Sequence, residues 1–329
     1  MSVLWTECSD AIAGRQAALR EEFLRVRQLS VAMVDGLNAE DCMVQSMPDA
    51  SPVKWHLAHL TWFFETFVLE PSIGPAYVPF DPSFRVLFNS YYVGVGEQHP
   101  RGERGLVSRP SLERVLAYRQ VVDERIASLM ASRVVPDDLL DVIQLGLHHE
   151  HQHQELILTD LKHHLWKNPL RPVYREAHAP LDRGVPPMTF VERPEGVAQI
   201  GAGDAGFAFD NERPRHRVWL ASFAIATRTV TCGEYLAFID DGGYHRPEYW
   251  LSEGWDVCMR EGWEAPLYWQ QDADGGWALF TLNGMRAMSR DEPVSHVSFL
   301  RPTPMRAGRA RACRRRPSGS APPKCWVST

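Results

Sequence analysis

Residues 145–165, LGLHHEHQHQELILTDLKHHL, decide how the first half of this chain folds. Four of the 13 histidines lie within residues 148–153, inside a segment whose apolar residues otherwise follow an amphipathic helical pattern. At 3.6 residues per turn, His149 and His153 are one turn apart and project from the same face. The segment therefore predicts a helix that presents two metal ligands.

A third ligand has to come from another part of the chain, and residues 55–59, WHLAH, offer His56 and His59. These histidines lie among Trp55, Trp62 and Phe63, where a polar group without a partner would be costly. A histidine within this apolar surface is best explained as a ligand. Together the two segments predict a mononuclear metal site.

Two polar residues, Gln152 and Glu155, flank the histidine pair, and we expect them to orient the imidazoles by hydrogen bonds. Three neutral imidazoles leave the full charge on a metal ion and leave coordination positions open. This set suits iron(II) with O2 or zinc that activates a thiol, and spacing alone does not choose between them. Other histidines lie on other helix faces and are expected at the surface or behind the ligands: His148, His151, His163 and His164.

The first half of the chain contains further helical patterns, at about 9–35, 53–69, 111–132 and 136–166. Ser51 and Pro52 read as an N-cap followed by proline at the first helical position. Residues 81–110 are polar and rich in Gly and Pro, and predict a long ordered connection. Four long helices with one crossover predict a four-helix bundle, a fold that builds metal sites from inward-facing side chains.

After residue 167 the pattern changes. Residues 168–187 contain five prolines and predict an interdomain linker. Short strands then follow at 198–201, 217–220 and 223–226, with glycine turns at 242–243, 275–276 and 283–284. The chain is thus predicted to be an α+β protein of two domains, 1–167 and 188–299.

Composition narrows the class of protein. With 44% hydrophobic and 23% charged residues the chain has an ordinary globular composition, and it has no apolar run that predicts a membrane span. We see no secretion signal at the N-terminus, and the six scattered cysteines predict reduced thiols rather than disulfides. These features favour a cytoplasmic protein that binds no membrane.

The motifs resemble those of the iron-dependent sulfoxide synthases of ergothioneine biosynthesis, the hercynine oxygenases. The resemblance covers roughly residues 10–299 and rests on these segments: SPVKWHLAH (51–59), FNSYY (88–92), His149-x-x-x-His153-x-Glu155, FAFDNE (207–212), DGGY (241–244) and PVSHVS (293–298). It implies an N-terminal DinB-like helical bundle and a C-terminal domain related to formylglycine-generating enzymes, which have a C-type-lectin-like fold.

The resemblance also implies roles for individual residues. The iron ligands would be His59, His149 and His153, since His59 takes the family's ligand position. Gln152 would contact the imidazole of the substrate, and Arg104 would hold the carboxylate of a thiol substrate. A solvated loop arginine is the alternative interpretation of Arg104.

The implied cofactor is Fe(II), and the implied small-molecule substrates are O2, hercynine and a thiol, either γ-glutamylcysteine or cysteine. Four-electron reduction of O2 would accompany formation of a C–S bond at the imidazole and oxidation of the sulfur to a sulfoxide. Aromatic or carboxylate groups would surround the trimethylammonium group.

The resemblance ends at Phe299, where a basic, proline-rich tail of residues 300–329 begins, with seven Arg, one Lys and no acidic residue. Permitted codons for residues 301–319, shifted by one base, encode EADAYARWAGARLPTEAEW, which contains a motif of the family. We therefore interpret 300–329 as an out-of-frame, disordered tail rather than a nucleic-acid-binding arm. The family's catalytic tyrosine would lie beyond this point, so the second domain would be incomplete.

Two alternatives remain open from the sequence. A zinc-dependent thiol transferase on the same DinB-like bundle fits three histidines equally well, although it does not account for the second domain. A truncated, inactive protein that keeps only a metal-binding site is also consistent with the tail.

Overall fold

The computed structural model describes residues 2–132, 134–176 and 184–298, with side chains from residue 13 onward. Contacts divide it into two compact units, one of which runs to Glu176 and includes Leu282–Gly284. The predicted linker falls partly on residues 177–183, and the predicted tail lies wholly beyond residue 298. The tail and residues 177–183 of the linker therefore lie outside the described part of the chain, whereas residues 168–176 of the predicted linker belong to the first unit.

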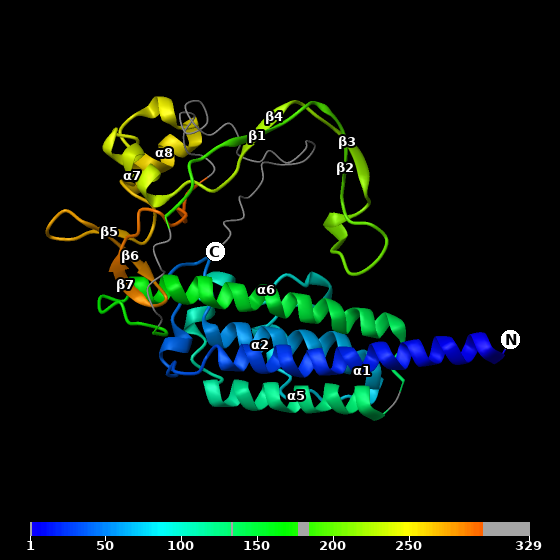
Figure 1. Cartoon of the computed structure of the whole chain (residues 1–329). Coiled ribbons are helices and arrows are strands. Elements are labelled where there is room, and N and C mark those ends of the chain that lie inside the picture. Colours follow the sequence, from blue (N-terminus) through cyan, green and yellow to red (C-terminus); the bar gives the residue numbers. More distant parts are fainter. Residues whose placement is uncertain (1, 133, 177–183, 299–329) are drawn as a thin grey trace. The chain divides into compact units, whose positions relative to one another are not determined.

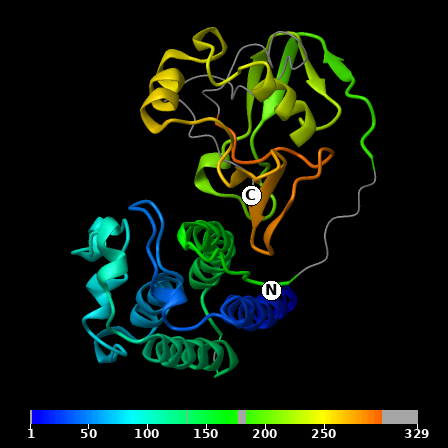
Figure 2. The same cartoon turned by 90° about the vertical axis from the view of Figure 1, so that its left-hand side faces the viewer.

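The first unit is the predicted four-helix bundle (Figure 1). Its long helices are α1 (Ser2–Ala32), α2 (Val53–Phe64), α5 (Leu112–Ser132) and α6 (Asp137–Lys167). Helix α2 packs on both α5 and α6, and α1 packs on the same two helices. Figure 2 looks nearly along the helix axes and shows these four helices side by side.

Helix α2 is buried on every side, and its sequence is apolar apart from four polar residues, Lys54, His56, His59 and Thr61. All twelve of its residues are buried. The predicted cap is wrong, because Pro52 occupies the N-cap position and Ser51 does not cap the helix. The Ser51 hydroxyl instead accepts a hydrogen bond from Arg104, at 2.9 Å.

The predicted helix over 53–69 is continuous but changes geometry, since its last turn, Glu65–Leu69, is a π-helix. This turn buries Glu65, whose carboxylate accepts hydrogen bonds from the Tyr77 hydroxyl and the Phe80 amide. A short helix, α3 (Glu70–Ile73), follows.

The long connection between α2 and α5 contains more helix than the sequence predicted. It holds α4 (Phe84–Leu87) and 3-10 turns at Gly74–Ala76, Val93–Val95 and Arg101–Leu106. Figure 2 shows this connection in cyan, on one side of the bundle.

The second unit combines small antiparallel sheets with two helices, and the predicted α+β class is confirmed. Strand β1 (Phe190–Arg193) pairs with β4 (Phe223–Ala226), and β2 (Gly196–Ile200) pairs with β3 (His216–Leu220). A three-stranded sheet has the order β5 (Trp269–Gln271), β6 (Trp277–Thr281), β7 (Gly284–Ala287). The three strands predicted from the sequence correspond to β2, β3 and β4.

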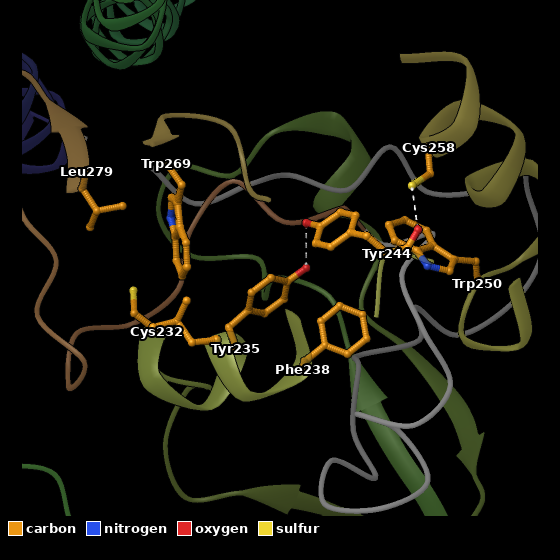
Figure 3. Close-up of a cluster of buried hydrophobic side chains, with 9 residues drawn as sticks. Cys232, Tyr235, Phe238, Tyr244, Trp250, Cys258, Trp269 and Leu279 are labelled. Carbon is orange, nitrogen blue, oxygen red and sulfur yellow. Dashed lines mark hydrogen bonds between the residues drawn. The ribbon is translucent and has the colours of Figure 1, made fainter. Parts of the chain in front are cut away.

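A compact aromatic core holds helices α7 (Cys232–Asp240) and α8 (Ser252–Glu261) in place. Figure 3 shows the hydroxyl groups of Tyr235 and Tyr244 pointing toward one another, 3.1 Å apart, within this core. The Trp250 indole donates a hydrogen bond to the Gly243 carbonyl at 2.8 Å. The predicted turn at 242–243 thus also supplies an acceptor for a core side chain.

Candidate metal centre

Three histidines meet inside the bundle, as the sequence predicted. His149 and His153 lie on α6 and His59 lies on α2, and one ring nitrogen from each falls within 4.8 Å of the other two. The His59 and His153 side chains are buried, whereas His149 is only half-buried. Among the His, Cys, Asp and Glu side chains that the structure describes, these three histidines lie close enough together to hold a metal ion.

Packing and a hydrogen bond fix the His59 ring. Its Nδ1 lies 2.7 Å from the Phe88 carbonyl oxygen in the long connection, and a carbonyl can only accept. The Nδ1 therefore carries the proton and leaves Nε2 with a free lone pair. Trp55 and Trp62 stack on this ring, with centroids 4.7 Å and 5.6 Å away, because they lie one turn before and one turn after it on α2.

The His153 ring has a side-chain partner rather than a backbone partner. Its Nδ1 lies 2.8 Å from Nδ1 of His56, and Nε2 of His56 lies 3.1 Å from an Asp160 carboxylate oxygen. The backbone N–H of Ser51 donates to the same Asp160 oxygen at 2.8 Å. His56, one of the two candidates for the third ligand, therefore stands behind a ligand.

The His149 ring has one nitrogen with no hydrogen bond. Its Nδ1 is buried without a partner, and the ring packs against Phe63 and His153 at centroid distances of 5.0 Å and 4.6 Å. A buried polar atom without a partner is costly, and a metal bond to the ring would offset part of that cost. This observation shows that the residues present fit a metal ion.

Burial keeps all three rings neutral at physiological pH. It lowers the pKa of His149 to about 4, although the neighbouring Glu150 opposes the shift. Burial also lowers the pKa of His59 and His153 well below the usual range, and the charges of neighbouring histidines add to the effect. Neutral imidazoles are the form that binds metals.

Behind the ligands, the bundle contains buried charges that the sequence did not reveal. Glu150, next to His149, is fully buried and pairs with Arg27 on α1 and Arg119 on α5. The Ser30 hydroxyl also donates to Glu150, at 2.6 Å. This network joins α6 to both neighbouring helices beside the metal ligands.

Arg104 is buried, so its interpretation as a solvated loop residue is wrong. Its guanidinium lies 3.4 Å from the Trp55 ring centroid and donates to the hydroxyls of Ser51 and Ser90. Its Nε is buried without a partner, and no carboxylate among the described residues forms a salt bridge with it. Burial, followed by the charge of Arg101, lowers the pKa of Arg104 to about 10, so it stays a cation.

The remaining predicted site residues lie at the edge of the cluster. Gln152 and Glu155 are exposed on α6, in the turn that carries His149 and His153. For His153 the partner of Nδ1 is His56. An orienting role for Glu155 stays a prediction.

Four other histidines on α6 lie outside the ligand cluster, as expected. His148 and His151 are half-buried. His163 and His164 are buried rather than at the surface, and both rings lie within hydrogen-bond distance of the Ser46 hydroxyl.

Comparison with known proteins gives one domain match for each unit. Residues 22–157 match the DinB superfamily, and residues 179–301 match the Sulfatase-modifying factor enzyme 1-like domain. Among the described residues, no helix is both long enough and apolar enough to span a bilayer.

Three curated relatives carry the name hercynine oxygenase. The Mycobacterium tuberculosis protein is 32% identical over 280 residues, which make up 84% of this chain and 62% of the relative. The Mycolicibacterium thermoresistibile protein is 32% identical over 297 residues, 87% of this chain and 61% of the relative. The Mycolicibacterium smegmatis protein is 30% identical over 289 residues, with 86% and 63% covered. The chain thus spans somewhat over three fifths of the length of these relatives.

Proposed function

The chain belongs to the hercynine oxygenase family, the sulfoxide synthases of ergothioneine biosynthesis, and from this premise we propose that it is a non-heme iron(II) enzyme. The proposed reaction joins hercynine to γ-glutamylcysteine or cysteine. One C–H and one S–H bond are replaced by a C–S bond, one oxygen atom of O2 enters the sulfoxide, and the other leaves as water. The observation that carries the proposal is the set of three neutral imidazoles from α2 and α6.

His59, His149 and His153 would hold the iron. A bound Fe(II) ion would activate O2 and favour the thiolate form of the thiol substrate at neutral pH. The chain's own contribution is to fix the ligand rings and to surround them with apolar side chains that exclude water. Trp55 and Trp62, one turn before and one turn after His59, stack on its ring and shield it from water.

Arg104 is proposed to bind the carboxylate of the thiol substrate. Its support is a buried positive charge that stacks on Trp55 and lacks a negative partner among the described residues. A substrate carboxylate would supply that partner, with charge-assisted hydrogen bonds that are stronger than neutral ones. We expect Arg104→Lys to keep the charge but to raise the KM for the thiol roughly 10-fold or more, because lysine loses the planar donor geometry.

Gln152 is proposed to contact the imidazole of hercynine. Its support is its exposed position on α6, three residues after His149 and one before His153. An amide can donate to or accept from a neutral imidazole, so it fits this role chemically. We expect Gln152→Leu to raise the KM for hercynine and to leave metal content unchanged.

Metal analysis followed by an anaerobic and then an aerobic assay tests the function. The chain is loaded with Fe(II) without O2, mixed with hercynine and γ-glutamylcysteine or cysteine, and exposed to O2. We expect O2 uptake and a sulfoxide product, both lost in His149→Ala. Full occupancy by zinc with no O2 consumption would contradict the proposal and favour a zinc-dependent thiol transferase, whereas metal binding without any turnover would favour an inactive metal-binding protein.

Residues 300–329 are proposed to be read out of frame. The match to the second domain ends at residue 301, close to where the family motifs cease. Sequencing the gene across the Phe299 codon tests this directly. An uninterrupted frame through Thr329 in independent reads would place the frameshift in the gene itself rather than in the reading of its sequence. Codons for residues 301–319 that do not encode the family motif when shifted by one base would overturn the proposal.

A further inference from the structure

Asp160, His56 and His153 form a line of hydrogen-bonding groups between α6 and α2. Asp160 Oδ2 lies 3.1 Å from His56 Nε2, and His56 Nδ1 lies 2.8 Å from His153 Nδ1. All three residues are less than a tenth exposed. Water therefore does not compete for these contacts, and the protons on the line have to be arranged among the three side chains themselves.

The possible proton positions follow from what each group can do. An ionised carboxylate only accepts, so the Nε2 of His56 has to carry a proton. With this single proton on the ring, Nδ1 of His56 has only a lone pair, whereas a second proton on His56 would reverse the contact and place the His153 proton on Nε2. With a neutral His56 ring, the one remaining way to make the contact between the two Nδ1 atoms is for Nδ1 of His153 to carry the proton and donate it.

This arrangement decides which nitrogen of His153 is available to a metal. With its proton on Nδ1, His153 presents the lone pair of Nε2. Free neutral imidazoles exchange between the two tautomers, so fixing one of them removes a cost from metal binding. For His59 the Phe88 carbonyl has the same effect through a single backbone contact.

We propose that Asp160 and His56 are positioning residues that hold His153 in the Nδ1–H tautomer and so prepare it as a metal ligand. The proposal rests on the metal site of the proposed function but not on its substrates or its reaction. His56 itself is not a fourth ligand, because both of its ring nitrogens are engaged.

A purely structural role for the pair predicts something different. Asp160 also accepts from the backbone N–H of Ser51, so it helps to anchor the start of α2. If anchoring were its only role, substitutions would lower stability without changing the tautomer of His153. The tautomer is therefore the measurement that separates the two roles.

The first experiment uses the metal-free chain labelled with 15N-histidine. Two-bond 1H–15N correlation spectra distinguish Nδ1–H from Nε2–H rings, and the His153→Gln spectrum assigns the signal. We expect His153 to be the Nδ1–H tautomer in the unmodified chain and to become a mixture in His56→Phe. A proton on Nε2 of His153 in the unmodified chain would overturn the proposal.

The second experiment measures the dissociation constants of Zn(II) and Co(II) by competition with a chromophoric chelator. We expect His56→Phe and Asp160→Ala to weaken binding about 10–100-fold, the usual effect of losing a group that supports a ligand. Asp160→Asn should recover much of the affinity, because its amide oxygen can still accept from both partners. His163→Gln replaces a buried histidine on α6 that lies beside Ser46, is the control variant, and should change affinity less than about 2-fold.

Far-UV circular dichroism checks that each variant is folded, and Asp160→Asn provides the comparison if His56→Phe does not fold. A folded His56→Phe or Asp160→Ala with unchanged metal affinity would overturn the proposal. If the unmodified chain bound no metal, the proposed metal site would fail, and the tautomer of His153 in the metal-free chain would still decide whether Asp160 and His56 orient this ring.

Discussion

Replacing Glu150 by glutamine removes the carboxylate that pairs with both Arg27 and Arg119, and leaves Asp123, which pairs with Arg27, as the remaining negative charge of the network. Glu150 accepts from Arg27 Nη1 at 2.9 Å and pairs with Arg119 Nη2, whereas Nε and Nη1 of Arg119 are buried without a hydrogen-bond partner. Burial and the nearby Arg27 lower the pKa of Arg119, but an arginine stays charged well above neutral pH. The substitution therefore leaves buried positive charge that is not compensated.

The pKa of Glu150 and the usual cost of breaking a buried ion pair give a similar loss of folding stability for Glu150→Gln. Burial alone would raise the pKa of Glu150, but the two arginines and Ser30 outweigh it and lower the pKa to about 2. A depression of this size from the ordinary value of a glutamate corresponds to about 3 kcal/mol of stability. Breaking a buried ion pair by removing one partner typically costs about 3–5 kcal/mol. We expect Glu150→Gln to lower the free energy of unfolding by about 3 kcal/mol at pH 7.

The depressed pKa of Glu150 determines how its contribution to stability changes with pH. Because the pKa of Glu150 is depressed by folding, its contribution is complete above the pKa of the unfolded state, about 4.5, and is lost as the pH falls toward 2. The difference between the unmodified chain and the variant should therefore disappear over this range.

Urea unfolding followed by far-UV circular dichroism measures this difference, since the helical bundle dominates the signal. Glu21→Gln on α1 replaces an exposed glutamate and should change stability by less than about 0.5 kcal/mol. A loss below about 1 kcal/mol for Glu150→Gln at pH 7, or a loss that persists at pH 2, would refute the reasoning.

Three further predictions concern other parts of the chain. Gly146→Ala should destabilise by about 1–3 kcal/mol in urea unfolding, although alanine normally favours helices, because its Cβ would lie 2.7 Å from the Phe64 ring. In the metal-free chain, the depressed pKa of His149 means that stability is lost as the pH falls from about 6.5 to about 4, by about 3 kcal/mol, and His149→Gln should remove this part of the pH dependence. Thr231→Ala removes the side chain that accepts from the Glu234 amide at the start of α7, and faster hydrogen exchange there should report a loss of about 1 kcal/mol.

The pairing of His149 and His153 could be predicted from helical spacing, because residues four apart lie one turn apart in any helix. The apolar segment 55–59 indicated that one of its histidines would join them, but it offered both His56 and His59, and only the family resemblance favoured His59. Three of the short strands, β2, β3 and β4, were also predicted from the sequence.

The groups behind the ligands could not be predicted in the same way, because they depend on contacts between helices. Glu150 reads as one more charge in a polar run, and Asp160 as a surface residue. The spacing of Glu150 and Arg27 along their helices nevertheless indicated that both side chains are buried. Glu150 follows Leu147 and precedes Ile157 at the spacing of the buried face, and Arg27 falls on the equivalent face of α1. Charges of opposite sign at core positions of two helices indicate a buried pair.

The capping prediction failed for a related reason. Ser51 and Pro52 form a typical helix start, but the Ser51 hydroxyl accepts a hydrogen bond from the buried guanidinium of Arg104 instead of capping the helix. A tertiary partner outweighed the local preference, and sequence order alone does not show that Arg104 lies beside it.

The two tryptophans that stack on His59 make the chain a fluorescent sensor of its own ligand cluster. Any open-shell ion that settled on this ring would lie within a few side-chain widths of both indoles and would quench their emission, whereas closed-shell zinc would leave it largely intact. Among the tryptophans whose side chains the structure describes, Trp55 and Trp62 stack on this ring, so the quenching would be a minor share of the total emission of eleven tryptophans, and Trp55→Phe and Trp62→Phe would identify its source. Metal arrival could thus be timed in solution without substrate, turnover or an added dye.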